Sequence, residues 1–265
     1  MRVPSMTLAA AGLVLLAPAL PSAAAPRPPA LPSAAAPLPS APAPLPSAAA
    51  PRPPAAGPHA PVSMRPPGAV RAAELLARAR SCAPVSRGRY RTDDDTPPTV
   101  PVCGTRDAVI WTADLDIDCD GRPTPRCNGD TDPLFAEATA FAQADGRYPS
   151  AETLPYIVVP APSARWDHRR DGVRGGSVAA VVHRGRVQYA VVGDIGPSDI
   201  IGEASYATAR ALGIRADPHG GGAPSGVTYI VFKDSEVKPI EDRAAVTAVG
   251  ERLARQFVRG GRGAG

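Results

Sequence analysis

The chain has 265 residues, a formal net charge of +4 and a sequence pI near 9.1. Four Arg and no acid precede Val70, and four Arg and one Glu follow Val249; removing these contributions of +4 and +3 leaves −3 for residues 70–249. A slightly acidic body excludes an extended nucleic-acid surface and suits a cationic ligand, because carboxylates concentrate positive ligands.

The first 25 residues are predicted to be a secretory signal peptide. Arg2 gives a positive start, residues 8–20 form an apolar stretch, and small residues at 21–25 offer a cleavage site. The uncharged run is too short for a membrane span, and two prolines interrupt it. We therefore expect a secreted, extracellular protein that does not associate with membranes after export.

Residues 26–68 are predicted to be a Pro/Ala-rich disordered linker. The string at 20–30 recurs letter for letter at 45–55. Proline at this density blocks helical hydrogen bonding, and the segment has too little apolar area to offset the entropy of ordering. Residues 69–265 remain, and they are expected to form one folded domain.

The hydrophobic patterning of this domain predicts an α+β fold with a strand-rich core and peripheral helices. Helices are expected at 70–80, 133–143, 203–212 and 241–258, with Gly213 ending the third. Strands are expected at 108–112, 154–159, 178–183, 187–192 and 227–232. A hairpin turn is expected at 184–186 and a polar surface loop at 86–101.

Four cysteines fit an exported protein with two disulfides. The pairs nearest in sequence are Cys82 with Cys103 and Cys119 with Cys127, and we expect this pairing among the three that four cysteines allow. Neither pair has CxxC spacing, so a zinc site is not expected. No metal and no cofactor are predicted.

Two carboxylates, Asp194 and Glu203, flank a short link that contains Gly196, Pro197 and Gly202. Two carboxyl groups facing one bond are the minimum equipment for glycoside hydrolysis. At the start of a predicted helix, Glu203 would have a lowered pKa and would suit a general base, which leaves Asp194 as the acid. The alternative is structural: one acid ends a turn and the other lies in the first turn of a helix.

A second acidic motif contains Asp114, Asp116, Asp118 and Asp120. Alternation along a strand places the four on one face, where a cation must relieve their repulsion. From Asp116 the motif matches half of an EF-hand loop, but Cys127 stands where the bidentate Glu is required. We expect these aspartates to bind substrate amine groups; a solvated, acidic strand end is the alternative.

Four strings in order resemble the family 75 glycoside hydrolases, which are chitosanases. They are DLDIDCDG (114–121), LPYIVVP (154–160), GDIGPSDIIGEASYA (193–207) and SGVTYIVF (225–232). PIEDRAAVTAVGERLA (239–254) resembles the closing segment of the bacterial branch. The resemblance covers residues 81–258, which is essentially the whole predicted domain.

The resemblance implies a secreted endo-hydrolase that cleaves the β-1,4 bonds of chitosan, a polycationic polysaccharide, with inversion. It implies that Asp194 and Glu203 are the acid/base pair, and that the core is a strand-rich barrel, for which the double-psi type is the candidate. Fungal members have a longer loop between the two acids. A monomer with no nucleic-acid partner is expected.

Three other functions fit the same features. The first is a non-catalytic secreted module that binds an amino-sugar polymer. The second is a hydrolase for a different amino-sugar polymer, such as chitin or peptidoglycan. The third is a structural domain stabilised by calcium.

Overall fold

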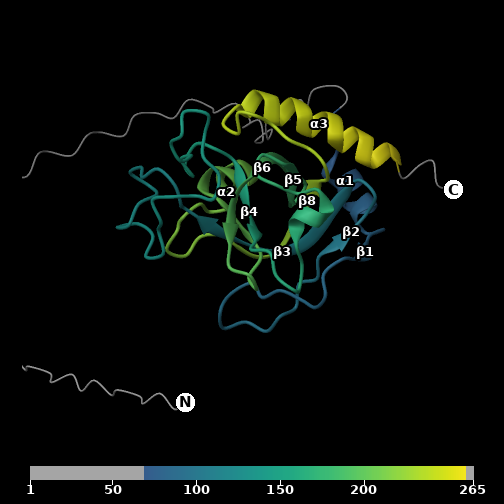
Figure 1. The fold of residues 1–265 in the computed structure, drawn as a ribbon, viewed down its shortest axis with the longest axis horizontal. Coiled ribbons are helices and arrows are strands. Elements are labelled where there is room, and N and C mark those ends of the chain that lie inside the picture. The colour runs from purple at the N-terminus through teal and green to yellow at the C-terminus, as the bar shows by residue number, and fades with distance from the viewer. Residues whose placement is uncertain (1–68, 261–265) are drawn as a thin grey trace, which may run out of the picture. The chain divides into compact units, whose positions relative to one another are not determined.

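The computed structural model describes residues 69–260 (Figure 1). The predicted signal peptide and linker, and residues 261–265, lie outside this part. Within 69–260, no helix combines the length and apolar character needed to cross a bilayer.

Six strands close into a barrel, as the strand-rich prediction requires. Their hydrogen-bonded order is β3 (Ala108–Asp118), β7 (Glu203–Ser205), β4 (Tyr156–Pro160), β6 (Arg186–Gly196), β5 (Val178–His183) and β8 (Ala223–Phe232). The ring closes because β8 also pairs with β3. The β3–β7 and β4–β6 pairs are parallel and the other pairs of the ring are antiparallel. Two short strands, β1 (Ala83–Pro84) and β2 (Cys103–Gly104), extend the sheet beside β3.

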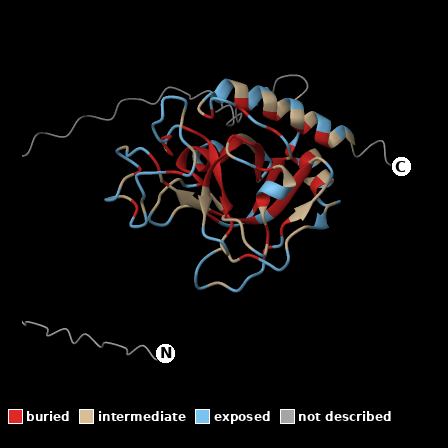
Figure 2. Ribbon diagram, in the orientation of Figure 1, coloured by how far each residue is buried: buried red, intermediate tan, exposed pale blue. Residues whose placement is uncertain are grey.

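Most positions in the barrel strands are buried, and the exposed or half-buried ones lie mainly toward the strand ends (Figure 2). Every position of β5 is buried, and its alternate residues enter two different hydrophobic clusters. One cluster also contains Leu75 of α1 (Ala72–Ala79) and Phe257 of α3 (Arg243–Gly260), which shows that these helices cover the outside of the sheet. Such continuous apolar runs are typical of strands with no solvated face.

Most predicted elements are confirmed, and three of the five predicted strands, β3, β6 and β8, are longer than predicted. The third predicted strand, the hairpin turn and the first and last predicted helices lie where they were expected. Arg184 and Gly185 both have positive φ, at 43° and 78°, as a two-residue hairpin turn requires. Both predicted disulfides, Cys82–Cys103 and Cys119–Cys127, are confirmed.

The helix predicted at 133–143 is wrong, because this segment is irregular. Its backbone N–H groups bond to carboxylates elsewhere in the fold: that of Ala136 donates to Asp120 and that of Ala140 donates to Asp194. A helix would commit those donors to carbonyls four residues back. Tertiary contacts therefore override the local composition.

The helix predicted at 203–212 begins three residues late. The helix observed there, α2 (Tyr206–Leu212), is capped by Ser205, whose Oγ accepts a hydrogen bond from the N–H of Thr208. Gly213 ends it in the left-handed conformation, as predicted. Residues 203–205 instead form β7, so Glu203 belongs to the barrel wall and not to a helix.

Candidate active site

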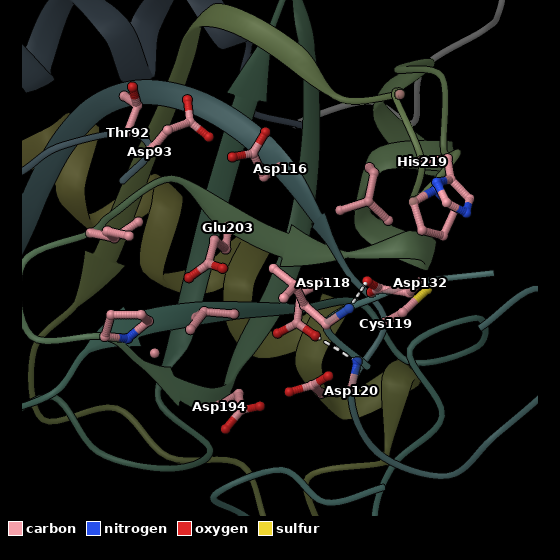
Figure 3. A pocket seen from close by; sticks show the side chains of 18 of the residues that line it. Thr92, Asp93, Asp116, Asp118, Cys119, Asp120, Asp132, Asp194, Glu203 and His219 are labelled. Carbon is pink, nitrogen blue, oxygen red and sulfur yellow. Dashed lines mark hydrogen bonds between the residues drawn. The ribbon is translucent and has the colours of Figure 1, made fainter. Parts of the chain in front are cut away.

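A cleft of about 580 Å³ opens where β3, β6 and β7 present their acidic residues (Figure 3). Among the described residues, its lining includes no Lys or Arg and nine carboxylates: Asp93, Asp94, Asp116, Asp118, Asp120, Asp132, Asp194, Glu203 and Asp217. The chain as a whole is basic, so this concentration of one sign of charge is local. Charge of one sign in a cleft focuses ligands of the opposite sign.

The barrel places Asp194 and Glu203 on the same cleft (Figure 3). Asp194 lies near the end of β6 and Glu203 begins β7. The single strand β4 lies between these two strands and contributes Val158 to the cleft. Neighbouring strands are about 4.8 Å apart, so the backbones of the two acids are separated by about 10 Å.

Asp194 is buried, with 6% of its surface exposed. Its Oδ1 accepts two backbone N–H bonds of 2.7 Å, one from Ala140 and one from Ile195. Burial raises the pKa of Asp194, and these two donors oppose the rise because they stabilise the carboxylate. No hydrogen bond within residues 69–260 involves its Oδ2, which leaves that oxygen able to bind a water.

Glu203 is half-buried, and no described residue donates a hydrogen bond to its carboxylate. Burial raises the pKa of Glu203 to about 7, and the negative charges of Asp116 and Asp120 add to the rise. The prediction that a helix dipole lowers this pKa is therefore wrong, because the residue lies on β7. Glu203 pairs in register with Asp116 across the parallel β3–β7 ladder.

Three of the four aspartates of the second motif line the cleft, namely Asp116, Asp118 and Asp120. Asp118 is fixed by its Oδ1, which accepts hydrogen bonds from the N–H of Asp120 at 2.7 Å and the hydroxyl of Tyr156 at 3.0 Å. Asp114 is 4% exposed and lies behind the cleft wall. Ladder pairing between β3 and β8 shifts at Ala113 and Leu115, next to this residue.

The pKa values of the four motif aspartates are all raised, and burial is the largest cause in each case. The pKa of Asp116 rises to about 6 and that of Asp120 to about 6. The pKa of Asp114 rises to about 8, with Asp116 as its largest charged neighbour, and that of Asp118 is raised well above its usual range. Bringing these carboxylates together thus costs free energy unless protons or a cation offset the repulsion.

The carboxylates form two groups that could hold a cation. Asp118, Asp120 and Asp194 offer one oxygen each within 4.8 Å of one another, and so do Asp93, Asp114 and Asp116. The first group combines two aspartates of the motif with Asp194, one member of the candidate catalytic pair. The second brings in a residue of the 86–101 loop.

Sequence reasoning missed several residues of the cleft. The 86–101 loop contributes Thr92, Asp93 and Asp94, and the segment 217–221 contributes His219. From the irregular segment comes Leu134, which is 89% exposed. The sequence signal for the loop residues was the acidic run at 93–95 in a turn-rich segment. This run does not indicate which part of the fold the loop packs against.

Several other polar and aromatic residues lie away from the cleft. Trp166 and Tyr206 have aromatic faces of the kind that can stack on a sugar, but both are buried and neither lines the cleft. His168 is buried and its Nδ1 is bonded to the carbonyl of Val173 at 2.9 Å. These residues are part of the hydrophobic core and its polar contacts.

Comparison with known proteins gives one matching family model, described as fungal chitosanase of glycosyl hydrolase group 75, over residues 115–258. Endo-chitosanase C of Aspergillus oryzae is 33% identical over 137 residues, which are 50% of this chain and 33% of that protein. An endo-chitosanase of the same organism is 31% identical over 140 residues, or 48% of this chain and 56% of that protein. The chain thus spans a third to about half of the length of these relatives.

Proposed function

The chain belongs to glycosyl hydrolase group 75, and from this membership we propose that it is a secreted endo-chitosanase that cleaves β-1,4 bonds with inversion. The observation that supports this best is the cleft lined by nine carboxylates with no Lys or Arg among its described residues. A glucosamine polymer has one ammonium group per deacetylated sugar, so such a cleft attracts it.

We propose that Glu203 is the general acid and Asp194 the general base, which reverses the roles inferred from the sequence. A general acid must hold a proton near neutral pH, and the raised pKa of Glu203 provides this. Asp194 keeps its negative charge better, because two N–H groups donate to it. Glu203 gives its proton to the glycosidic oxygen as the C1–O bond breaks, while Asp194 takes a proton from the attacking water.

The spacing of the strands supports inversion. Inverting glycosidases keep their two carboxyl groups roughly 6.5–9.5 Å apart to admit a water, whereas retaining enzymes need about 5 Å. Backbones separated by about 10 Å, with side chains that enter one cleft, suit the larger separation.

Around this pair, Asp116, Asp118 and Asp120 would hold ammonium groups of neighbouring sugars. Asp114 is buried behind the wall, and we no longer propose it as a substrate ligand.

Product analysis on soluble chitosan tests the function. We expect new reducing ends, a rapid fall in viscosity and an α-anomer as the first product in NMR spectra, since a β bond is inverted. Chitin and peptidoglycan serve as comparison substrates, and faster cleavage of either would reassign the substrate. Binding without new reducing ends would favour the non-catalytic module, and a β-anomer would exclude inversion.

The pH dependence of activity should reveal the pKa of the general acid. We expect kcat/KM on soluble glucosamine oligomers, in EDTA to keep the cleft free of divalent cations, to fall as pH rises through about 7. Above this pH Glu203 loses the proton that the reaction needs. Asp116→Asn removes a negative neighbour, so the pKa of Glu203 and the basic limb should both move to lower pH. Asp130→Asn, exposed and outside the cleft, is the control. A basic limb that stays in place in Asp116→Asn would contradict the assignment.

A further inference from the structure

The second carboxylate group joins two parts of the chain that are distant in sequence. Asp93 lies in a turn that is fixed by Thr96, whose N–H and Oγ1 both donate to the Asp93 carbonyl, while Asp114 and Asp116 lie on β3. One carboxylate oxygen from each of the three lies within 4.8 Å of the others. Figure 3 shows Asp93 and Asp116 next to each other at one side of the cleft.

Asp114 is the unusual member of this group. Its side chain is 96% buried, since 4% of its surface is exposed, and its Oδ1 has no hydrogen-bond partner. Gly202 leaves room for that oxygen: a Cβ at Gly202 would lie 1.9 Å from it. The backbone is held as well, because the Tyr229 hydroxyl donates to the carbonyls of both Asp114 and Gly202 at 3.0 Å. A buried acceptor that is held in place without a donor costs free energy unless something outside the chain binds it.

No basic side chain within residues 69–260 forms an ion pair with this group. The neighbouring Arg91 is directed elsewhere: its guanidinium lies 3.6 Å from Asp199 and donates to the carbonyls of Asp94 and Thr96. The loop is thus fixed beside β3 while its acidic side chain faces two others. Three carboxylates with no counter-charge repel one another, and a cation from solution can offset this repulsion without protonating them.

We propose that Asp93, Asp114 and Asp116 form a calcium site that ties the 86–101 loop to β3 at the edge of the cleft. The ligands are all hard oxygens, which favour calcium, magnesium or manganese over softer metals. Magnesium usually takes one or two carboxylates and keeps most of its waters, whereas calcium accepts several carboxylates in irregular geometry. Exposed Asp93 leaves the outer side open to the waters that complete the shell.

This site differs from the EF-hand half-match considered from the sequence, and the comparisons do not assign it. The half-match ran from Asp116 to Cys127 along one loop, whereas the proposed ligands come from two segments. The family match begins at residue 115, so Asp93 and Asp114 both lie outside it. Binding of calcium here does not require that the protein cleave chitosan.

The test is calcium binding by the full chain, first depleted with EDTA. We expect calorimetry with CaCl₂ to give one site with Kd of about 10⁻⁴–10⁻³ M, the range of extracellular calcium modules. At 10 mM calcium, Tm should rise by about 3–10 °C. Asp93→Asn and Asp114→Asn should each weaken binding at least tenfold. Asp94→Asn, the adjacent loop carboxylate outside the group, is the matched control and should bind like wild type.

Several results would overturn the proposal. One is a wild-type protein that shows neither heat nor a change in Tm at 10 mM calcium. Another is Asp93→Asn with wild-type affinity, which would place the ion at Asp118, Asp120 and Asp194; because Asp93 is exposed, this variant is informative even if Asp114→Asn does not fold. An equal response to magnesium would overturn the choice of calcium. If only glucosamine oligomers bind, and Asp93→Asn weakens them, the group is an ammonium site.

Discussion

Replacing Glu203 by Gln is expected to lower kcat on soluble chitosan by about 10²–10⁴-fold, the usual contribution of a positioned general acid or base. The amide keeps the shape of the side chain but has no proton that it can transfer to the leaving oxygen. Asp194→Asn should lose activity to a similar extent. Its side-chain oxygen can still accept the N–H groups of Ala140 and Ile195, so the local structure should persist.

Matched controls separate a chemical effect from a structural one. Glu251→Gln lies on α3, outside the cleft, and Asp130→Asn is exposed outside it, so each repeats the same chemical change away from the site. Both should keep wild-type kcat, and all four variants should keep the wild-type circular dichroism spectrum. Near-normal kcat in Glu203→Gln or Asp194→Asn would exclude that carboxyl from the reaction.

Gly202→Ala should strongly destabilise the fold. Gly202 has a φ of 129°, a conformation that residues with a Cβ rarely adopt, and the new Cβ would overlap Asp114 Oδ1. Strain and the displaced buried carboxylate together should lower the free energy of unfolding by about 3–5 kcal/mol. Urea denaturation measures this loss. Gly220→Ala is the control: its Cβ would meet nothing within 4 Å, so its midpoint should barely move.

A double-mutant cycle tests the cause of that loss. If the overlap with the Asp114 carboxylate dominates, Asp114→Ala should recover part of the stability in the Gly202→Ala background, with a coupling energy of about 1–3 kcal/mol. Additive effects would show that backbone strain alone is responsible. A wild-type urea midpoint in Gly202→Ala would refute both explanations.

The sequence predicts the barrel better than it predicts the helices. Runs such as Val178–His183 are buried on both faces, so their composition alone identifies them as strands. Residues 133–143 have helical composition, yet their N–H groups bond to Asp120 and Asp194, which are 16 and 54 residues away in sequence from their donors. Local helix propensity does not depend on such distant hydrogen-bond partners and so cannot predict them. Likewise, nothing near Glu203 indicates that a three-residue strand would insert between β3 and β4.

The same limit applies to the site. Asp194, Glu203 and three of the four motif aspartates could be placed on one cleft from the sequence, because resemblance and strand alternation both point to them. Asp93 could not, since its position depends on where the 86–101 loop meets the barrel. The relative pKa values of the two acids also depend on burial, which the spacing of residues does not reveal. The roles expected from the sequence rested on a helix that begins at Glu203, whereas the observed helix begins at Tyr206.

Strand β4 lies between β6 and β7 and therefore sets the distance between the strands that contain Asp194 and Glu203. Because Val158 and its neighbours lie between the two acidic strands, the separation of these strands depends on the hydrogen-bond ladder of the wall. The connection from Gly196 to Gly202 only has to span that separation. If the proposed mechanism holds, residues inserted into this connection should leave the stereochemical outcome unchanged, because they would not move the two strands.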